Sequence, residues 1–425
     1  MKTLIQGGMI FQNSEFQTRD ILLDDGIIAQ IGPHIDPTQA DQIIAVSGQT
    51  VLPGLVDVHV HFRDPGQTDK ETVKTGSEAS AHGGYTTVCA MPNVTPVPNT
   101  PDKLRQMINY NDEQGVISVK QFAPVTYDEH GDQLVDFDGM KKAGAVAFSN
   151  DGVGIQTAKT MYDAMTSIAK TGLPLAAHVE DHALMNGGVM NEGSASNKLG
   201  LKGAPEVAET SQLARDLELA RVTGVHYHVC HVSTARSVEL IRRAKADGVN
   251  VTAEVTPHHL LLDDSMIQAD DPMYKMNPPM RTRKDREALL AGLLDGTIDM
   301  IATDHAPHTS ADKGHSFNDA AFGITGIETA FPLLYTQLVK TKKVTLSQLL
   351  KWMSSAPTAK FNLSNENEIK IGNHTNFSIW DLNAPHQIAT KDMKSKGHNS
   401  LFLGDQVDAQ NLMTFANGKL IYQDQ

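Results

Sequence analysis

Two histidines separated by a single residue lie in the segment LVDVHVHFRDPG, residues 55–66. In an extended strand alternate side chains share a face, so we expect His59 and His61 on one face and Val58 and Val60 on the other. Neutral imidazole is a common nitrogen ligand for zinc-like ions. The spacing therefore suits a metal site, although two histidines hydrogen-bonded to backbone carbonyl groups would fit the same pattern.

Other residues of metal-binding type lie at the ends of further β-rich segments. They are Asp151 after 144–149, His178 within 174–180, His231 within 226–233 and Asp304 within 300–305. Imidazoles hold a borderline ion such as Zn²⁺, and a carboxylate such as that of Asp151 can bridge two ions. Zinc lowers the pKa of bound water, and a carboxylate such as Asp304 can accept the proton of that water and return it to a leaving group. The predicted chemistry is metal-dependent hydrolysis or the reverse condensation.

The fold must bring these histidines and aspartates together. The β-rich segments alternate with helical patterns, and they lie at 52–61, 85–91, 119–126, 144–149, 174–180, 226–233, 250–256 and 300–305. Eight strands that alternate with helices over about 250 residues predict an α/β fold, the (β/α)8 or TIM barrel. The C-terminal ends of barrel strands meet at one mouth, where the candidate ligands would gather. A doubly wound sheet is the alternative, which the lack of a GxGxxG motif after the first strand disfavours.

The two ends of the chain lie outside this pattern. Residues 1–52 and 363–425 have the composition of short strands joined by polar turns, whereas residues 53–362 carry the barrel pattern. We expect the two terminal segments to pair into one small composite β domain beside the barrel.

Composition narrows the function further. The 425 residues carry a formal net charge of −14, which argues against nucleic acid or an anionic membrane as the main partner. No apolar run reaches the roughly 18–20 residues of a transmembrane helix. The two cysteines, Cys89 and Cys230, are too few for a disulfide framework and fit a reducing cytoplasm. An anionic small-molecule substrate would need a local cationic pocket.

Several motifs extend the histidine segment and carry a family resemblance. They are HFRDPG, MPNVTP, FSNDGVG, HVCHVST, EVTPHHL, NPPMR, ATDHAPH and FGITGIET, within residues 53 to about 330. Through them the chain resembles the amidohydrolase superfamily and, within it, the dihydroorotase family of the type common in Gram-positive bacteria. The resemblance implies the zinc-dependent, reversible cyclisation of N-carbamoyl-L-aspartate to L-dihydroorotate in pyrimidine biosynthesis, carried out by a homodimer.

The resemblance also implies roles for single residues. Two zinc ions would be held, one by His59, His61 and Asp304 and the other by His178 and His231, with Asp151 as the bridge and Asp304 as the catalytic proton carrier. Substrate contacts would come from His61, Arg63, Asn93, Asn277, His308 and the backbone of Phe322 and Gly323. Arg63 follows His61 by two residues, so it would share the metal-facing side if the chain stays extended, and a guanidinium grips a carboxylate with two hydrogen bonds.

One departure separates this chain from part of the superfamily. Hydantoinases, allantoinases and some dihydroorotases bridge their metals with a carboxylated lysine, but Lys141 and Lys142 precede the segment 144–149 and lie at its wrong end. Asp151 is therefore the expected bridge. Another cyclic amidase of the allantoinase or hydantoinase type and a non-catalytic dihydroorotase-like scaffold are the alternative functions.

Some nearby residues are expected to have other roles. We expect His226 and His228 to pack behind the barrel rather than bind metal, and we assign no role to Asn150. The polar segment 309–320 resembles a mobile lid, with a solvated connector as the alternative interpretation.

Overall fold

A closed barrel of parallel strands forms the larger part of the molecule. The computed structural model describes residues 1–12, 15–364 and 367–424. The barrel strands are β6 (Leu55–Val60), β7 (Tyr85–Ala90), β8 (Ser118–Gln121) continued by β9 (Ala123–Pro124), β10 (Phe148–Ser149), β11 (Leu175–Ala177), β14 (Tyr227–Val229), β15 (Val251–Val255) and β16 (Met300–Ile301). Neighbouring strands pair in parallel, and a parallel bridge between Val60 and His305 closes the ring. The predicted TIM barrel is confirmed.

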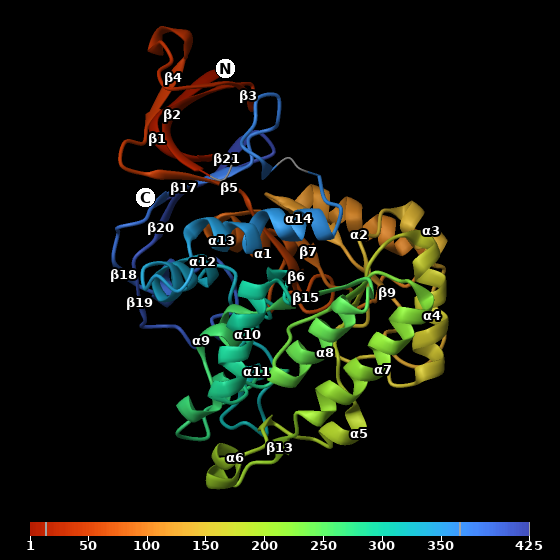
Figure 1. Cartoon of the computed structure of the whole chain (residues 1–425). Coiled ribbons are helices and arrows are strands. Elements are labelled where there is room, and N and C mark those ends of the chain that lie inside the picture. The colour runs from red at the N-terminus through yellow and green to blue at the C-terminus, as the bar shows by residue number, and fades with distance from the viewer. Residues whose placement is uncertain (13–14, 365–366, 425) are drawn as a thin grey trace.

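Helices surround this barrel (Figure 1). The longer ones are α1 (Val73–His82), α2 (Pro101–Gln114), α3 (Phe137–Ala143), α4 (Ala158–Thr171), α7 (Val207–Thr223), α8 (Ala235–Ala246) and α10 (Arg283–Asp295), followed by a C-terminal group from α12 (Ala330–Leu334) to α14 (Ala356–Lys360). Helix α4 illustrates how the sequence sets the boundaries. The Thr157 side chain accepts a hydrogen bond from the Thr160 amide at its start, and Gly172 adopts a positive φ of 72° at its end. None of the helices in the described ranges is long and apolar enough to cross a membrane.

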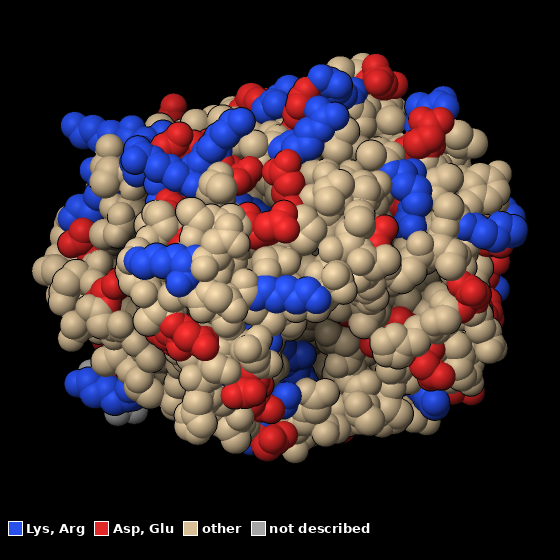
Figure 2. Space-filling view, turned by 90° about the horizontal axis from the view of Figure 1, so that it is seen from below, with Lys and Arg blue, Asp and Glu red and all other residues tan. Residues whose placement is uncertain are grey.

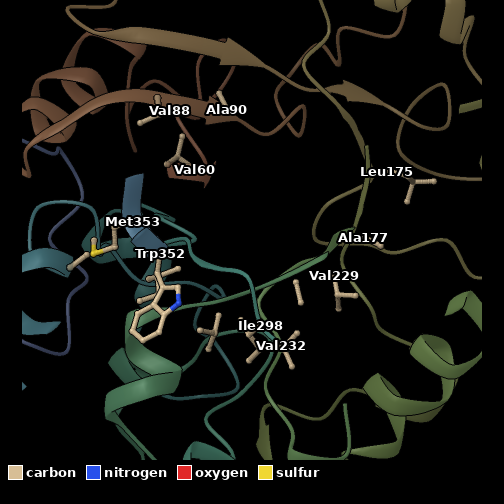
Figure 3. Packing of buried hydrophobic residues seen from close by; sticks show 14 of the residues in the cluster. Val60, Val88, Ala90, Leu175, Ala177, Val229, Val232, Ile298, Trp352 and Met353 are labelled. Atoms are coloured by element: carbon tan, nitrogen blue, oxygen red, sulfur yellow. The ribbon is translucent and has the colours of Figure 1, made fainter. Parts of the chain in front are cut away.

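Two apolar layers stabilise the barrel. One lies between strands and helices and includes Val88, Leu175 and Trp352 (Figure 3). The other fills the barrel interior and takes residues from most of its strands, namely Val56, Val58, Cys89, Met91, Phe122, Ala147, Ala176, Cys230, Met300, Ala302 and Phe361. Val58 belongs to the inner layer and Val60 to the outer one, so the expectation that they share a face was wrong. The cause is an irregular register between β6 and β7 from Asp57 to Val60, which breaks the strict alternation.

The ends of the chain build a second sheet beside the barrel (Figure 1). Its strand order is β21-β20-β17-β5-β1-β2-β3, with β4 paired to β1. The strands are β1 (Lys2–Gln12), β2 (Glu15–Asp24), β3 (Ile27–Gly32), β4 (Gln42–Ala45), β5 (Thr50–Pro53), β17 (Phe377–Asp381), β20 (Gln410–Ala416) and β21 (Lys419–Gln423). Strand β5 pairs antiparallel with β17, for example at Val51 and Ile379. The predicted pairing of the two ends into one composite β domain is confirmed.

Candidate metal centre

The six histidines and aspartates that the sequence singled out converge at the mouth of the barrel, with Asp151 at their centre. Asp151 Oδ1 lies 3.4 Å from His59 Nε2, 3.6 Å from His231 Nε2 and 3.9 Å from His178 Nδ1, and Asp151 Oδ2 lies 3.4 Å from His61 Nε2. Asp304 Oδ1 lies 3.0 Å from His61 Nε2 and 3.4 Å from His59 Nε2. A carboxylate surrounded by imidazoles from several strands is the arrangement that a bridged pair of ions would require.

The ligand atoms form overlapping groups. The atoms of His59, His61 and Asp151 lie within 4.8 Å of one another, and so do those of Asp151, His178 and His231. A third group joins His59 and His231 to Asp304. Asp151 belongs to the first two groups, as a bridging residue would.

Two buried polar atoms at this centre have no hydrogen-bond partner among the described residues. They are His59 Nε2 and Asp151 Oδ1, which face each other at 3.4 Å. An unpaired polar atom in a protein interior costs about 1–3 kcal/mol, so folded proteins rarely leave one unsatisfied. A cation between these atoms would satisfy both, and the donor set of imidazoles and carboxylates therefore fits a zinc-like ion.

The electrostatics of the centre also favour a cation. Burial alone would lower the pKa of His59, but the charges of Asp151, Glu254 and Asp304 outweigh it and raise that pKa well above its ordinary value. Burial alone would raise the pKa of Asp304, but the charge of His59 and the hydrogen bond and charge of His61 lower it below the ordinary range. Burial alone would also raise the pKa of Asp151, but His59 and His231 lower it well below its ordinary value. Both aspartates are therefore ionised.

Neighbouring side chains fix the orientation of the first two histidines. His61 Nδ1 lies 2.9 Å from Asn93 Oδ1, and His59 Nδ1 lies 2.6 Å from Glu254 Oε1. In both rings Nδ1 therefore donates, and Nε2 is left to face the centre. Sequence reasoning missed Glu254, although an acidic residue inside the apolar strand β15, which is buried along its whole length, is the signal that could have identified it.

Asn150, to which we assigned no role, holds the end of β10 beside Asp151. Its Oδ1 accepts hydrogen bonds from the amides of Val125 and Thr126, and its Nδ2 donates to Thr126 Oγ1. These bonds tie the residue before Asp151 to the end of the neighbouring strand. Lys141 lies elsewhere and donates to the carbonyl of Thr171.

Arg63 lies near the centre, but its backbone is not in the extended conformation that we expected. Its φ is 59°, so the chain has left the extended conformation on which the expectation rested, because β6 already ends at Val60. Its guanidinium is 3.5 Å from His308 Nε2, and His308 Nε2 lies 2.8 Å from the Phe322 carbonyl oxygen, to which it can donate. Burial and the charges of Arg63 and Lys70 lower the pKa of His308 to about 3, so its imidazole is neutral.

The remaining predicted contact residues lie on loops around the mouth. Asn277 Nδ2 donates to Glu180 Oε2 at 2.6 Å and lies 3.3 Å from His178 Nε2. Lys275 Nζ lies 4.5 Å from the centre of the Phe322 ring. The amide of Gly323 donates to the Lys275 carbonyl, so these loop segments are joined.

The segment 309–320 is packed against the protein rather than simply solvated. Lys313 is 3% exposed, and its ammonium group donates to the carbonyls of Lys275, Ala321 and Gly323. The side chain of Phe317 is fully buried.

Figure 2 shows the molecule from below the view of Figure 1, where the surface is hollowed and Lys or Arg side chains lie inside the hollow. A cationic recess suits an anionic ligand.

His228 lies inside the barrel, so the expectation that it packs behind the barrel was wrong. Its Nε2 is 3.0 Å from Glu254 Oε2, and its ring contacts Phe361 of the inner apolar layer. The residue points inward because it alternates with Tyr227 and Val229, which both belong to the outer layer.

Comparison with known proteins identifies relatives along the whole chain. Residues 48–237 match the family described as Dihydro-orotase-like. A dihydroorotase of Pediococcus pentosaceus is 56% identical over 423 residues, which cover 100% of this chain and 99% of the relative. A dihydroorotase of Ligilactobacillus salivarius is 53% identical over 425 residues, which cover 100% of this chain and 99% of the relative.

Solved structures share the fold. The L-hydantoinase of Arthrobacter aurescens superposes with a TM-score of 0.87 at 23% identity, covering 99% of this chain and 96% of that one. A D-hydantoinase gives a TM-score of 0.88 at 21% identity, covering 100% and 96%. At these identities the likeness concerns the fold, whereas the full-length relatives decide the family. The chain belongs to the dihydroorotase family of metal-dependent cyclic amidohydrolases.

Proposed function

We propose that this chain catalyses the reversible cyclisation of N-carbamoyl-L-aspartate to L-dihydroorotate with two zinc ions at the barrel mouth. The observation that carries the proposal is the convergence of imidazoles from separate strands on Asp151, where two buried polar atoms lack hydrogen-bond partners among the described residues. The ligands would be His59, His61 and Asp304 for one ion and His178 and His231 for the other, with Asp151 shared. Bound zinc would polarise the amide carbonyl and lower the pKa of water.

Asp304 is the residue proposed to move the proton. Its Oδ1 lies beside His61 Nε2 at 3.0 Å, and its side chain is 13% exposed, so it borders the open side of the centre. The charge of His59 and the hydrogen bond of His61 lower its pKa against the effect of burial, so the carboxylate is ionised and carries no proton of its own. In the hydrolytic direction Asp304 would take a proton from water and return it to the departing ring nitrogen, and in the cyclising direction it would take the proton from the attacking amide nitrogen.

The substrate carboxylate is proposed to bind on the Arg63 side. Arg63 is half-buried, but its Nε atom is buried and has no hydrogen-bond partner among the described residues. A guanidinium with a buried free donor suits a carboxylate, which both substrate and product carry. His308, Asn93, Asn277 and the backbone of Phe322 and Gly323 would complete the contacts.

A direct assay tests the proposed activity. Purified protein loaded with zinc is given L-dihydroorotate, N-carbamoyl-L-aspartate, allantoin and dihydrouracil in parallel. Turnover of the first two alone supports the proposal, whereas preferential hydrolysis of allantoin or dihydrouracil would identify a different cyclic amidase. The resemblance extends the proposal to a homodimer in the cytoplasm, and light scattering of the purified chain would test the dimer.

A further inference from the structure

A chain of hydrogen-bonded side chains runs from the metal centre through the barrel interior. His59 Nδ1 lies 2.6 Å from Glu254 Oε1, and Glu254 Oε2 lies 3.0 Å from His228 Nε2. His228 Nδ1 then lies 2.8 Å from Thr252 Oγ1, which is also 2.8 Å from His226 Nε2. His226 precedes β14, so the chain of contacts ends on the side of the barrel opposite the mouth.

These contacts are shielded from solvent. The side chains of His59, Glu254, His228 and Thr252 are at most 4% exposed. Water therefore does not compete for their hydrogen bonds, and each polar atom depends on its protein partner. A buried network in which every bond is made specifies one arrangement of its members.

The donors and acceptors in this network fix the protonated nitrogen of His59. An ionised carboxylate only accepts hydrogen bonds, so Glu254 requires a proton on His59 Nδ1 and another on His228 Nε2. In neutral His59 the lone pair is therefore at Nε2, the atom that lies 3.4 Å from both Asp151 Oδ1 and Asp304 Oδ1 and has no hydrogen-bond partner among the described residues. A neutral imidazole in this tautomer is the form that binds a metal through Nε2.

Glu254 also reaches the other half of the centre. Its Oε1 accepts a hydrogen bond from the backbone amide of His231 at 3.3 Å. His231 has a positive φ of 33°, which is uncommon for a residue with a side chain, so this bond supports a backbone conformation that needs support. One carboxylate thus contacts a ligand from each proposed ion site.

We propose that Glu254 and His228 are positioning residues of the metal centre, which hold His59 in its metal-binding tautomer and orientation. Thr252 and His226 hold His228 in turn, since the Thr252 hydroxyl bonds both rings. The inference rests on the proposed metal-dependent function, but only on its claim that His59 binds the ion. It predicts that the network acts on metal affinity and not merely on folding.

The substitution Glu254→Gln tests this with little change of shape. A glutamine replaces one of the two acceptor oxygens with an NH₂ donor, so one of the two imidazoles loses the acceptor that it contacts. We expect zinc affinity, measured by competition with a chromophoric chelator in the absence of substrate, to fall about 10- to 100-fold. Thr252→Val, which removes only the hydroxyl, should give a smaller loss in the same direction.

Asp216→Asn is the matched control. Asp216 is also a fully buried carboxylate, but it accepts hydrogen bonds from Arg215 and from the hydroxyl of Tyr227 on the outer side of β14. Among the described residues, neither of these partners belongs to the metal centre. We expect this variant to lower the melting temperature of the metal-free protein while its zinc affinity stays within twofold of the original. Melting curves of all metal-free variants separate stability from affinity.

The outcomes divide cleanly. Zinc affinity of Glu254→Gln within twofold of the original protein would overturn the inference, and so would an equal loss of affinity in Asp216→Asn. If Glu254→Gln does not fold, His228→Leu gives the same test, because it removes one of the donors to Glu254. Failure of the original protein to turn over dihydroorotate would overturn the proposed function, but the substrate-free affinity comparison would still decide the role of Glu254.

Discussion

The proposed metal ligands and the proposed substrate contacts share one barrel mouth, but different kinds of backbone hold them. The metal half, which we define as His59, His61, Asp151, His178, His231 and Asp304, lies within barrel strands or just after them. The substrate half, which we define as Arg63, Asn93, Asn277, His308, Phe322 and Gly323, lies on the connections beyond the strands. Barrel strands converge by construction, whereas loops must be fastened by contacts of their own.

The difference is visible in what each half contacts. Members of the metal half approach one another directly, as at 2.9 Å between His178 Nδ1 and His231 Nε2. In the substrate half, His308 Nε2 contacts the Phe322 carbonyl oxygen directly at 2.8 Å, but the Gly323 carbonyl is held by the ammonium of Lys313, a residue outside this half. Changes in the metal half should therefore alter chemistry, and changes in the substrate half should alter mainly substrate affinity.

The largest effect is expected from Asp304→Asn in the metal half. The amide cannot accept the proton, and positioned proton transfer contributes about 10²- to 10⁴-fold to rate. We expect kcat for dihydroorotate hydrolysis to fall by about that factor, with the melting temperature nearly unchanged. Asp295→Asn, at the partly exposed end of α10, is the control. A kcat near that of the original protein would refute the proton-carrier role.

A smaller effect of a different kind is expected from Arg63→Met in the substrate half. Hydrogen bonds to charged groups contribute about 1.5–3 kcal/mol each, so KM should rise by about 10²-fold or more. Zinc content, measured by mass spectrometry, should not change. An inhibitor that lacks the carboxylate should bind both proteins equally, and an equal loss for that inhibitor would contradict the assigned contact.

Lys313→Met tests whether the fastening of the loops matters. The change leaves the carbonyls of Lys275, Ala321 and Gly323 without the ammonium that they share. We expect KM to rise about tenfold, or about 1.4 kcal/mol, while zinc content stays constant. Steady-state kinetics would check this, with Lys74→Met on the exposed face of α1 as the control variant. An unchanged KM would mean that the substrate half does not depend on Lys313.

These predictions follow the division between what the sequence could and could not supply. The metal half was predictable because imidazoles and carboxylates recur at strand ends, and a barrel brings strand ends together. Arg63 was predicted on the premise that the chain stays extended after His61. That premise was wrong, because Arg63 lies beyond the end of β6 and has a positive φ. Glu254 went unnoticed because its partners His59 and His228 are distant in sequence, and a pattern of local spacing carries no information about such contacts. Lys313 went unnoticed because it binds backbone carbonyls, which no residue type in the sequence marks. Asn150 was overlooked because its partners Val125 and Thr126 are also distant in sequence.

The smallest effect is expected at the far end of the barrel, away from both halves. Burial and the charges of His228 and Lys360 lower the pKa of His226 from 6.5 to about 4. Between pH 6.5 and about 4 the unfolded chain binds a proton that the folded chain does not. The free energy of unfolding should therefore fall as pH falls through this window. In His226→Gln the free energy of unfolding should depend less on pH. Denaturant titrations at several pH values would measure this, and an equal pH dependence of the free energy of unfolding in both proteins would contradict the prediction.

The central claim is that the six side chains of the metal half, with Asp151 at their centre, hold two zinc ions that the reaction requires. The most direct test removes metal from one preparation with a chelator and then restores zinc stepwise, with bound zinc and dihydroorotate hydrolysis measured at each step. We expect no activity without metal and a plateau at two equivalents per chain. Full activity in metal-free protein, or a plateau at one equivalent with no further binding, would contradict the account.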